Sequence, residues 1–223
     1  MKSIVVVYTS LGGLINTMKK EFLERMPEYR LVNIADDSLI KEVMENGKVT
    51  ESVKKRMMHY FKAAAEWKPE VIVSACSSVG EVAEEAGKHL DVPIVRIDHA
   101  MIVKALEKGE RIGVLASLAT TMEPTVSYIQ RLATAMNRNV KVLGKVAEGA
   151  YEANSRGETE VHDTLIAEAA KSIMNDVDVI ILAQGSMAKM EGVLKEATGR
   201  PVFSSPRLCV EEVSTICRER CVS

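Results

Sequence analysis

Short apolar runs alternate along this chain with longer amphipathic segments. The run at residues 3–8 is rich in β-branched side chains and too continuous for a half-exposed strand, so it predicts a parallel strand buried on both faces. Residues 51–67 instead place Met57, Phe61 and Ala65 on one side at helical spacing, which predicts an amphipathic helix. The alternation of the two kinds of segment predicts right-handed β-α-β units and an α/β fold.

The pattern yields two series of elements, and each series predicts a four-stranded parallel sheet flanked by helices. The first series has strands at residues 3–8, 29–34, 71–74 and 93–97, and helices at 15–26, 51–67 and about 79–89. The second series has strands at residues 111–115, 140–143, 177–182 and 201–203, and helices at 126–136 and about 160–174.

The two series repeat each other at one offset. Cys76 and Gln184, which follow matched strands, are 108 positions apart (184 − 76), and the same offset relates Pro93 to Pro201. Several separate matches at one offset are hard to produce by chance. The repeat therefore predicts two pseudosymmetric lobes, with the active site between them.

The lobe boundaries follow from the last helix. A helix expected at residues 206–220 has no counterpart inside the second lobe, so it is assigned to the first, matching a helix at 100–108 that leaves it. Lobe 1 is thus expected to comprise residues 1–98 plus 207–223, and lobe 2 residues 99–206.

Composition narrows the class of protein. A hydrophobic content of 47% over 223 residues is enough for a packed core. The 29 basic and 31 acidic residues leave a net charge of −2, which provides no field for gathering nucleic acid or an anionic membrane. The first apolar run is too short for a membrane span or a secretory signal, so a cytoplasmic location is expected.

The cysteine pattern does not predict a metal site. The four cysteines form no Cys-x-x-Cys pair and lie near no histidine at ligand spacing. Cys209, Cys217 and Cys221 would fall on one face of a continuous helix. Packing as small apolar groups is the favoured interpretation for these three, and a redox role is the alternative.

Ligands of α/β sheets bind beyond the carboxyl ends of the strands. The residues there are mostly small hydroxyls, which with helix N-terminal amides can hold a carboxylate, although each hydroxyl could equally cap the next helix. The candidates are Thr9, Ser10, Cys76, Ser77, Ser78, Ser117, Thr120, Thr121, Gln184, Gly185 and Ser186.

Cys76 is the candidate for chemistry. It directly follows a strand where helix N-terminal amides would favour its thiolate, which suits a nucleophile or a base. The alternative is a small buried residue at a tight junction. Ser78 and Glu81 have capping-box spacing, so Glu81 is left out of the site. His99 could act as an acid or an orienting group, but a surface or capping histidine is favoured.

The motif Ala75-Cys76-Ser77-Ser78 resembles the Ala-Cys-Asn-Thr motif of the aspartate/glutamate (Asp/Glu/hydantoin) racemase superfamily. The segment 111–117 with Thr120-Thr121 is similar to the second-lobe entry of that family. The resemblance implies two pseudosymmetric α/β lobes, an interlobe site, no cofactor, and a homodimer or higher homo-oligomer. It also implies two cysteines that exchange a proton at a substrate α-carbon.

The chain departs from the family pattern at the second cysteine. Gln184 stands where the family's Leu-Gly-Cys-Thr type of motif has its thiol, and an amide is no useful acid or base. An atypical member is expected, with Cys76 as single thiol acid/base: a racemase, isomerase or decarboxylase acting on a small carboxylic or amino acid. Gln184 would donate to a substrate oxygen or satisfy backbone at its strand end. The alternative function is a non-catalytic carboxylate-binding protein.

Overall fold

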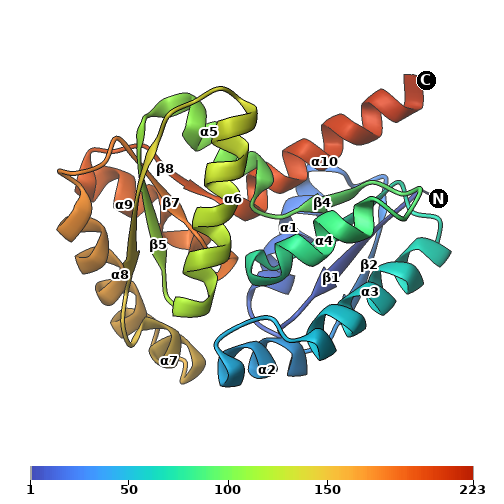
Figure 1. The fold of residues 1–223 in the computed structure, drawn as a ribbon, viewed down its shortest axis with the longest axis horizontal. Coiled ribbons are helices and arrows are strands. Elements are labelled where there is room, and N and C mark those ends of the chain that lie inside the picture. Colours follow the sequence, from blue (N-terminus) through green and yellow to red (C-terminus); the bar gives the residue numbers. More distant parts are fainter. Residues whose placement is uncertain (1, 223) are drawn as a thin grey trace. The chain divides into compact units, whose positions relative to one another are not determined.

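The computed structural model describes residues 2–222, with side chains for residues 2–220. The chain divides into two compact units: unit 1 comprises residues 1–99 and 206–223, and unit 2 comprises residues 100–205. Each unit contains one sheet with helices on its faces (Figure 1). Residues 1 and 223 of the expected first lobe lie outside the described residues.

The sheet of unit 1 has four parallel strands in the order β2-β1-β3-β4. Register pairs Val7 of β1 with Ser74 of β3, and Ser74 with Arg96 of β4, so these three strands end at one level. The strands are β1 (Ser3–Tyr8), β2 (Arg30–Ala35), β3 (Val71–Ser74) and β4 (Ile94–Arg96).

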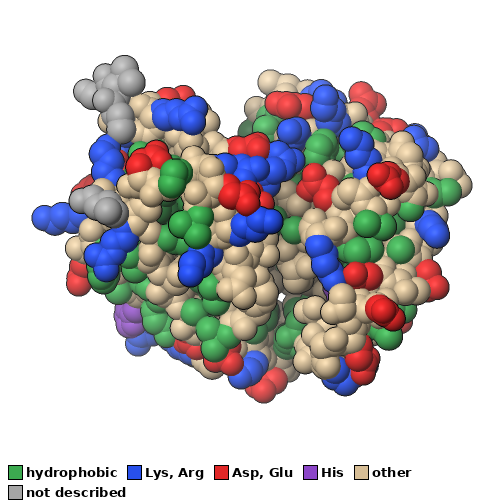
Figure 2. Space-filling model, turned by 180° about the vertical axis from the view of Figure 1, so that it is seen from behind, with side chains coloured by type: hydrophobic (Ala, Val, Ile, Leu, Met, Phe, Trp, Pro, Cys, Tyr) green, Lys and Arg blue, Asp and Glu red, His purple; other side chains and the backbone are tan. Residues whose placement is uncertain are grey.

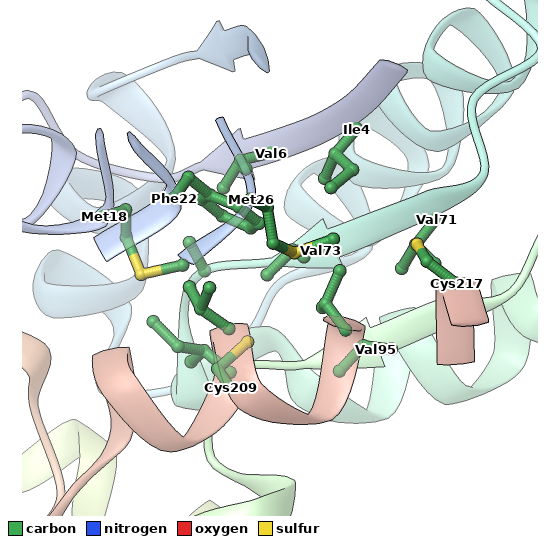
Figure 3. Packing of buried hydrophobic residues seen from close by; sticks show 14 of the residues in the cluster. Ile4, Val6, Met18, Phe22, Met26, Val71, Val73, Val95, Cys209 and Cys217 are labelled. Carbon is green, nitrogen blue, oxygen red and sulfur yellow. The ribbon is translucent and has the colours of Figure 1, made fainter. Parts of the chain in front are cut away.

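Helices cover both faces of this sheet, which is why its strands are continuously apolar. Val6 and Val73 point toward α1 (Leu14–Arg25) and α10 (Ser205–Val222), as Figure 3 shows. Val5 and Ile72 point the other way and pack in a second cluster. That cluster draws on α2 (Ser38–Asn46), α3 (Glu51–Glu66) and α4 (Gly80–Gly87).

Two of the C-terminal cysteines belong to the core of unit 1. Cys209 and Cys217 lie on α10 and are 0% and 1% exposed, packed toward the strands (Figure 3). Burial raises the pKa of the Cys209 thiol well above its ordinary value. The prediction that they pack as small apolar groups is confirmed for this pair, while the Cys221 side chain lies outside the described residues.

Unit 2 repeats the topology of unit 1, in the order β6-β5-β7-β8. Its strands are β5 (Arg111–Ala116), β6 (Lys141–Val146), β7 (Val179–Leu182) and β8 (Val202–Ser204). Its helices are α5 (His99–Lys108), whose first residue still belongs to unit 1, α6 (Met122–Ala135), α7 (Ala150–Ser155), α8 (Thr159–Ile173) and α9 (Glu191–Thr198). Buried side chains of α7, α8 and α9 pack together against one face of the sheet.

The repeat and the fold class predicted from sequence are confirmed. Strands β5, β7 and β8 begin 108 positions after β1, β3 and β4 (111 − 3, 179 − 71, 202 − 94). Two helices were not expected: α2 and α7 have nine and six residues, too few to display a helical period clearly. Strand β6 runs to Val146 instead of residue 143, because an exposed edge strand has little apolar pattern.

The surface is of mixed charge. On the face drawn in Figure 2, acidic and basic side chains are interspersed. Among the described residues, no helix combines the length and apolarity needed to span a membrane.

Candidate active site

The turn after β3 carries the cysteine predicted to be reactive. β3 ends at Ser74, Cys76 keeps an extended backbone (φ −150°, ψ 120°), and a single 3-10 turn, Ser77–Val79, leads into α4. Cys76 is half-buried and forms no disulfide, whereas Ser77 and Ser78 are buried. The thiol is thus held at a strand end but remains partly accessible.

The 3-10 turn changes the expected relation between Cys76 and the helix. The N-cap residue of α4 is Val79, one residue after Ser78, and α4 begins at Gly80. Cys76 therefore lies outside the first turn of α4, where a helix dipole acts most strongly. Local backbone geometry, more than the helix end, places this thiol.

The hydroxyls after β1 lie beside this turn. Val7 pairs with Ser74, so Thr9 and Cys76 each come two residues after that pair on neighbouring strands. Thr9 is 3% exposed and Ser10 is half-buried. The structure therefore brings Thr9, Ser10 and the Cys76 turn to one edge of the unit 1 sheet.

In unit 2, Gln184 occupies the position that Cys76 has in unit 1. The Gln184 Oε1 atom accepts a hydrogen bond from the Ser117 backbone N–H at 2.7 Å and one from the Ser117 hydroxyl at 3.3 Å. Its Nε2 donates to Thr121 Oγ1 at 3.3 Å. The side chain joins the end of β7 to the end of β5, as expected for a polar residue that satisfies backbone.

The other unit 2 candidates differ in exposure. Thr121 is buried and Gly185 is half-buried, whereas Ser186 is exposed. Thr120 Oγ1 is buried and has no hydrogen-bond partner among the described residues. Thr120 thus differs from Thr121, whose hydroxyl accepts a hydrogen bond from Gln184.

Sequence reasoning missed a buried charge cluster near the Cys76 turn. Arg96, the last residue of β4, is 4% exposed and donates to Asp98 through Nε at 2.9 Å and Nη2 at 2.8 Å, while Nη1 pairs with Glu84. A Cβ added to Gly80 would lie only 2.1 Å from the Arg96 Cζ atom. The guanidinium therefore fits against the start of α4 because Gly80 has no side chain. An arginine inside an otherwise apolar strand was the available signal.

Neither a metal-ligand cluster nor the pocket found among the described residues involves the predicted site residues. Among the described residues, no three His, Cys, Asp or Glu side chains are grouped so as to hold a metal ion. A pocket of about 320 Å³ in unit 1 is lined by residues of α1, β2 and their connection, such as Phe22 and Leu31. None of the predicted site residues lines that pocket, so the strand ends remain the candidate site.

Comparison with known proteins now adds a family. The Asp/Glu/hydantoin racemase family profile matches residues 13–213, most of the chain. No curated protein sequence matches this chain.

Solved structures give the same fold. The glutamate racemase isoform RacE1 from Bacillus anthracis is similar with a TM-score of 0.75 and 20% identity, covering 98% of this chain and 82% of that one. Allantoin racemase from Klebsiella pneumoniae gives 0.70 and 14%, covering 99% and 89%. Arylmalonate decarboxylase gives 0.63 and 12%, covering 96% and 92%. At these identities the likeness shows the fold alone.

Proposed function

Because the chain belongs to the Asp/Glu/hydantoin racemase family, we propose that it is a cofactor-independent enzyme acting at the α-carbon of a small carboxylic or amino acid. Cys76 is its single thiol acid/base. The observation that carries the proposal is the position of Cys76, a half-buried free thiol at a strand end, beside the hydroxyls that follow β1. Family membership supports carbon-acid chemistry, and the missing second thiol limits it to one face of the substrate.

In the proposed proton transfer, Cys76 serves as both base and acid. The Cys76 thiolate removes the α-proton, the C–H electron pair becomes an enolate delocalised onto the carboxylate, and the thiol returns a proton to the same carbon. General acid–base catalysis of this kind contributes about 10²–10⁴-fold in rate. With one thiol, the proton leaves and returns on one face.

A decarboxylation fits the same residues. In a malonate-like acid the bond to one carboxylate breaks and carbon dioxide leaves, while the electron pair remains on the α-carbon as an enolate. The Cys76 thiol then protonates that carbon, and water reprotonates the thiolate. The structural likeness to arylmalonate decarboxylase makes this reaction class worth testing.

Small hydroxyls are proposed to bind the substrate carboxylate. In unit 1 these are Thr9, Ser10, Ser77 and Ser78, which follow β1 and β3. In unit 2, Ser117, Thr120, Thr121, Gln184, Gly185 and Ser186 occupy the equivalent strand ends. Because the Gln184 carbonyl oxygen accepts from Ser117, only the remaining amide hydrogen of Gln184 is proposed to reach a ligand.

Solvent deuterium incorporation tests the proposal. Wild-type protein in D₂O is incubated with the enantiomers of aspartate and glutamate and with phenylmalonate, and the α-position is followed by NMR. Cys76→Ala should lower exchange or carbon dioxide release by about 10²–10⁴-fold, the contribution of an acid/base group. Cys217→Ala, which removes a buried thiol from the core of unit 1, is the matched control and should remain active. Full activity in Cys76→Ala would contradict the assignment of Cys76 as the acid/base.

One observation favours a second candidate, a non-catalytic carboxylate-binding protein. Gln184 is engaged in hydrogen bonds within unit 2 and supplies no acid or base at the position of the family's second thiol. Alkylation of Cys76 by iodoacetamide separates the two candidates. An ordinary thiol pKa together with ligand binding favours the binder, whereas a depressed pKa with substrate protection favours the enzyme.

A further inference from the structure

The end of β4 carries a histidine held by a carboxylate. His99 comes three residues after Arg96 and is the first residue of α5. Its Nδ1 donates to Glu212 Oε1 of α10 at 2.6 Å, and both residues belong to unit 1. The two residues are 113 positions apart in sequence, so the pair forms only when α10 packs against this sheet.

The pair lies at the same edge of the sheet as Cys76. Ser74 pairs with Arg96 on adjacent strands, and the Ile97 N–H extends this ladder by donating to the Ser74 carbonyl at 3.0 Å. Cys76 follows Ser74 by two residues and His99 follows Arg96 by three. Because parallel strands end at a common edge, both side chains belong to the region where α/β sheets bind ligands.

His99 is suited to carry positive charge there. The hydrogen bond to Glu212 raises the pKa of His99, and the nearby Asp98 carboxylate adds to this, while burial and Arg96 oppose it. Glu212 also faces the buried Cys209 thiol on α10. Its second oxygen, Oε2, is buried and has no hydrogen-bond partner among the described residues, so the bond to His99 is what holds this carboxylate.

Exposure separates His99 from the other cation at this strand end. The His99 side chain is 35% exposed, whereas Arg96 is 4% exposed. Arg96 already directs Nε and Nη2 to Asp98 and Nη1 to Glu84, so it does not present a pair of N–H donors to a ligand. An incoming anion at the end of β4 would therefore meet the imidazolium and not the guanidinium.

From this geometry we infer that His99, oriented by Glu212, binds the carboxylate of the substrate beside Cys76. The inference deepens the proposed function and rests on it. His99 is the group that touches the ligand, and Glu212 is a positioning residue that acts through it. The imidazolium supplies the positive charge that hydroxyls alone lack, and it stabilises the negative charge that develops on the carboxylate when an enolate forms.

The test follows the His99 ring of the whole protein by NMR, using malonate as the probe at constant ionic strength. The His99 signal is assigned with His99→Gln. Its titration midpoint should lie above about 6.5 in wild type, fall in Glu212→Gln, and rise further with malonate, since an anion prefers the protonated ring. A His99 midpoint that saturating malonate does not move would overturn the inference.

Two controls make the result specific. His89 pairs with Glu85 of α4 at 2.9 Å and is 61% exposed, so malonate should leave its ring signal unchanged. Sulfate replaces malonate in a second arm, and an equal shift with sulfate would show general anion binding and contradict carboxylate recognition.

The readout is separate from turnover. Where Cys76→Ala keeps full exchange activity while His99 still responds to malonate, the proposed function fails and the carboxylate site stands. In the catalysed reaction, Glu212→Gln should shift the alkaline limb of the kcat/KM profile to lower pH, because its His99 loses the proton sooner. An unshifted limb would remove the positioning role of Glu212.

Discussion

The junction between the last strand and the preceding helix is built in opposite ways in the two units. In unit 1 the strand contributes a large cation, Arg96, and the helix begins with Gly80. In unit 2 the strand ends in Ser204, and the helix begins with Glu191, whose Oε2 accepts from the Ser204 backbone N–H at 2.9 Å and from its hydroxyl at 2.5 Å. The large charged side chain is thus on the strand in unit 1 and on the helix in unit 2, and the small residue is on the other element.

This exchange has an electrostatic consequence. An acid in the first turn of α9 is favourable with the helix dipole, and a cation at the start of α4 is not. Unit 1 offsets that cost with two carboxylates, Asp98 and Glu84. Unit 2 thus joins strand and helix through one carboxylate, whereas unit 1 depends on a buried network beside the cysteine turn. The same contrast separates Cys76, proposed for chemistry, from Gln184, which holds two strand ends together.

The largest effect is expected from removing Arg96. Arg96→Met would leave the fully buried Asp98 carboxylate without its partner and should cost about 3–5 kcal/mol of unfolding free energy. Urea unfolding measures this. The matched variant is Arg111→Met in unit 2, where the guanidinium pairs with Asp178 but is 46% exposed. Equal losses in the two variants would contradict the importance of burial.

Gly80→Ala tests the close approach at α4. The new Cβ would meet the Arg96 guanidinium at 2.1–2.5 Å and displace it from Asp98 or Glu84, so a loss of about 1–3 kcal/mol is expected. Gly192→Ala in α9 meets nothing within 4 Å and should stabilise by up to about 1 kcal/mol, since alanine favours a helix. Thermal denaturation of both variants measures these changes in stability. A change in melting temperature of the same sign in each would rule out a steric origin for the loss in Gly80→Ala.

A smaller effect is expected at the position equivalent to Cys76. Gln184→Ala removes the acceptor for the Ser117 backbone N–H and should cost about 1–2 kcal/mol. Gln184→Glu keeps an acceptor there and should lose less. Hydrogen exchange of the Ser117 amide reports the contact directly. Protection that survives in Gln184→Ala would show that this side chain does not hold the strand ends together.

Much of the fold follows from local sequence, because buried parallel strands must be apolar on both faces. The runs that became β1 and β3 were recognisable for that reason, and so was their repetition at offset 108. The short helices α2 and α7 were not recognised, since nine and six residues carry too little periodicity.

The site was predictable only in part. Positions after strands could be named, but their partners could not, because Glu84 reaches Arg96 from α4 and Glu212 reaches His99 from α10. Whether a polar residue such as Gln184 faces a ligand or satisfies backbone depends on distances of a few tenths of an ångström. Side-chain packing decides that choice, and the spacing of residues along the chain does not encode it.

The central claim is that one thiol acts on one face of the substrate. It is tested most directly by the configuration of the product formed in D₂O, using the substrate identified by the exchange screen. Wild-type protein should give a single deuterated enantiomer, and Cys76→Ala should give none above the uncatalysed level. A racemic deuterated product, or an unchanged product from Cys76→Ala, would contradict the account.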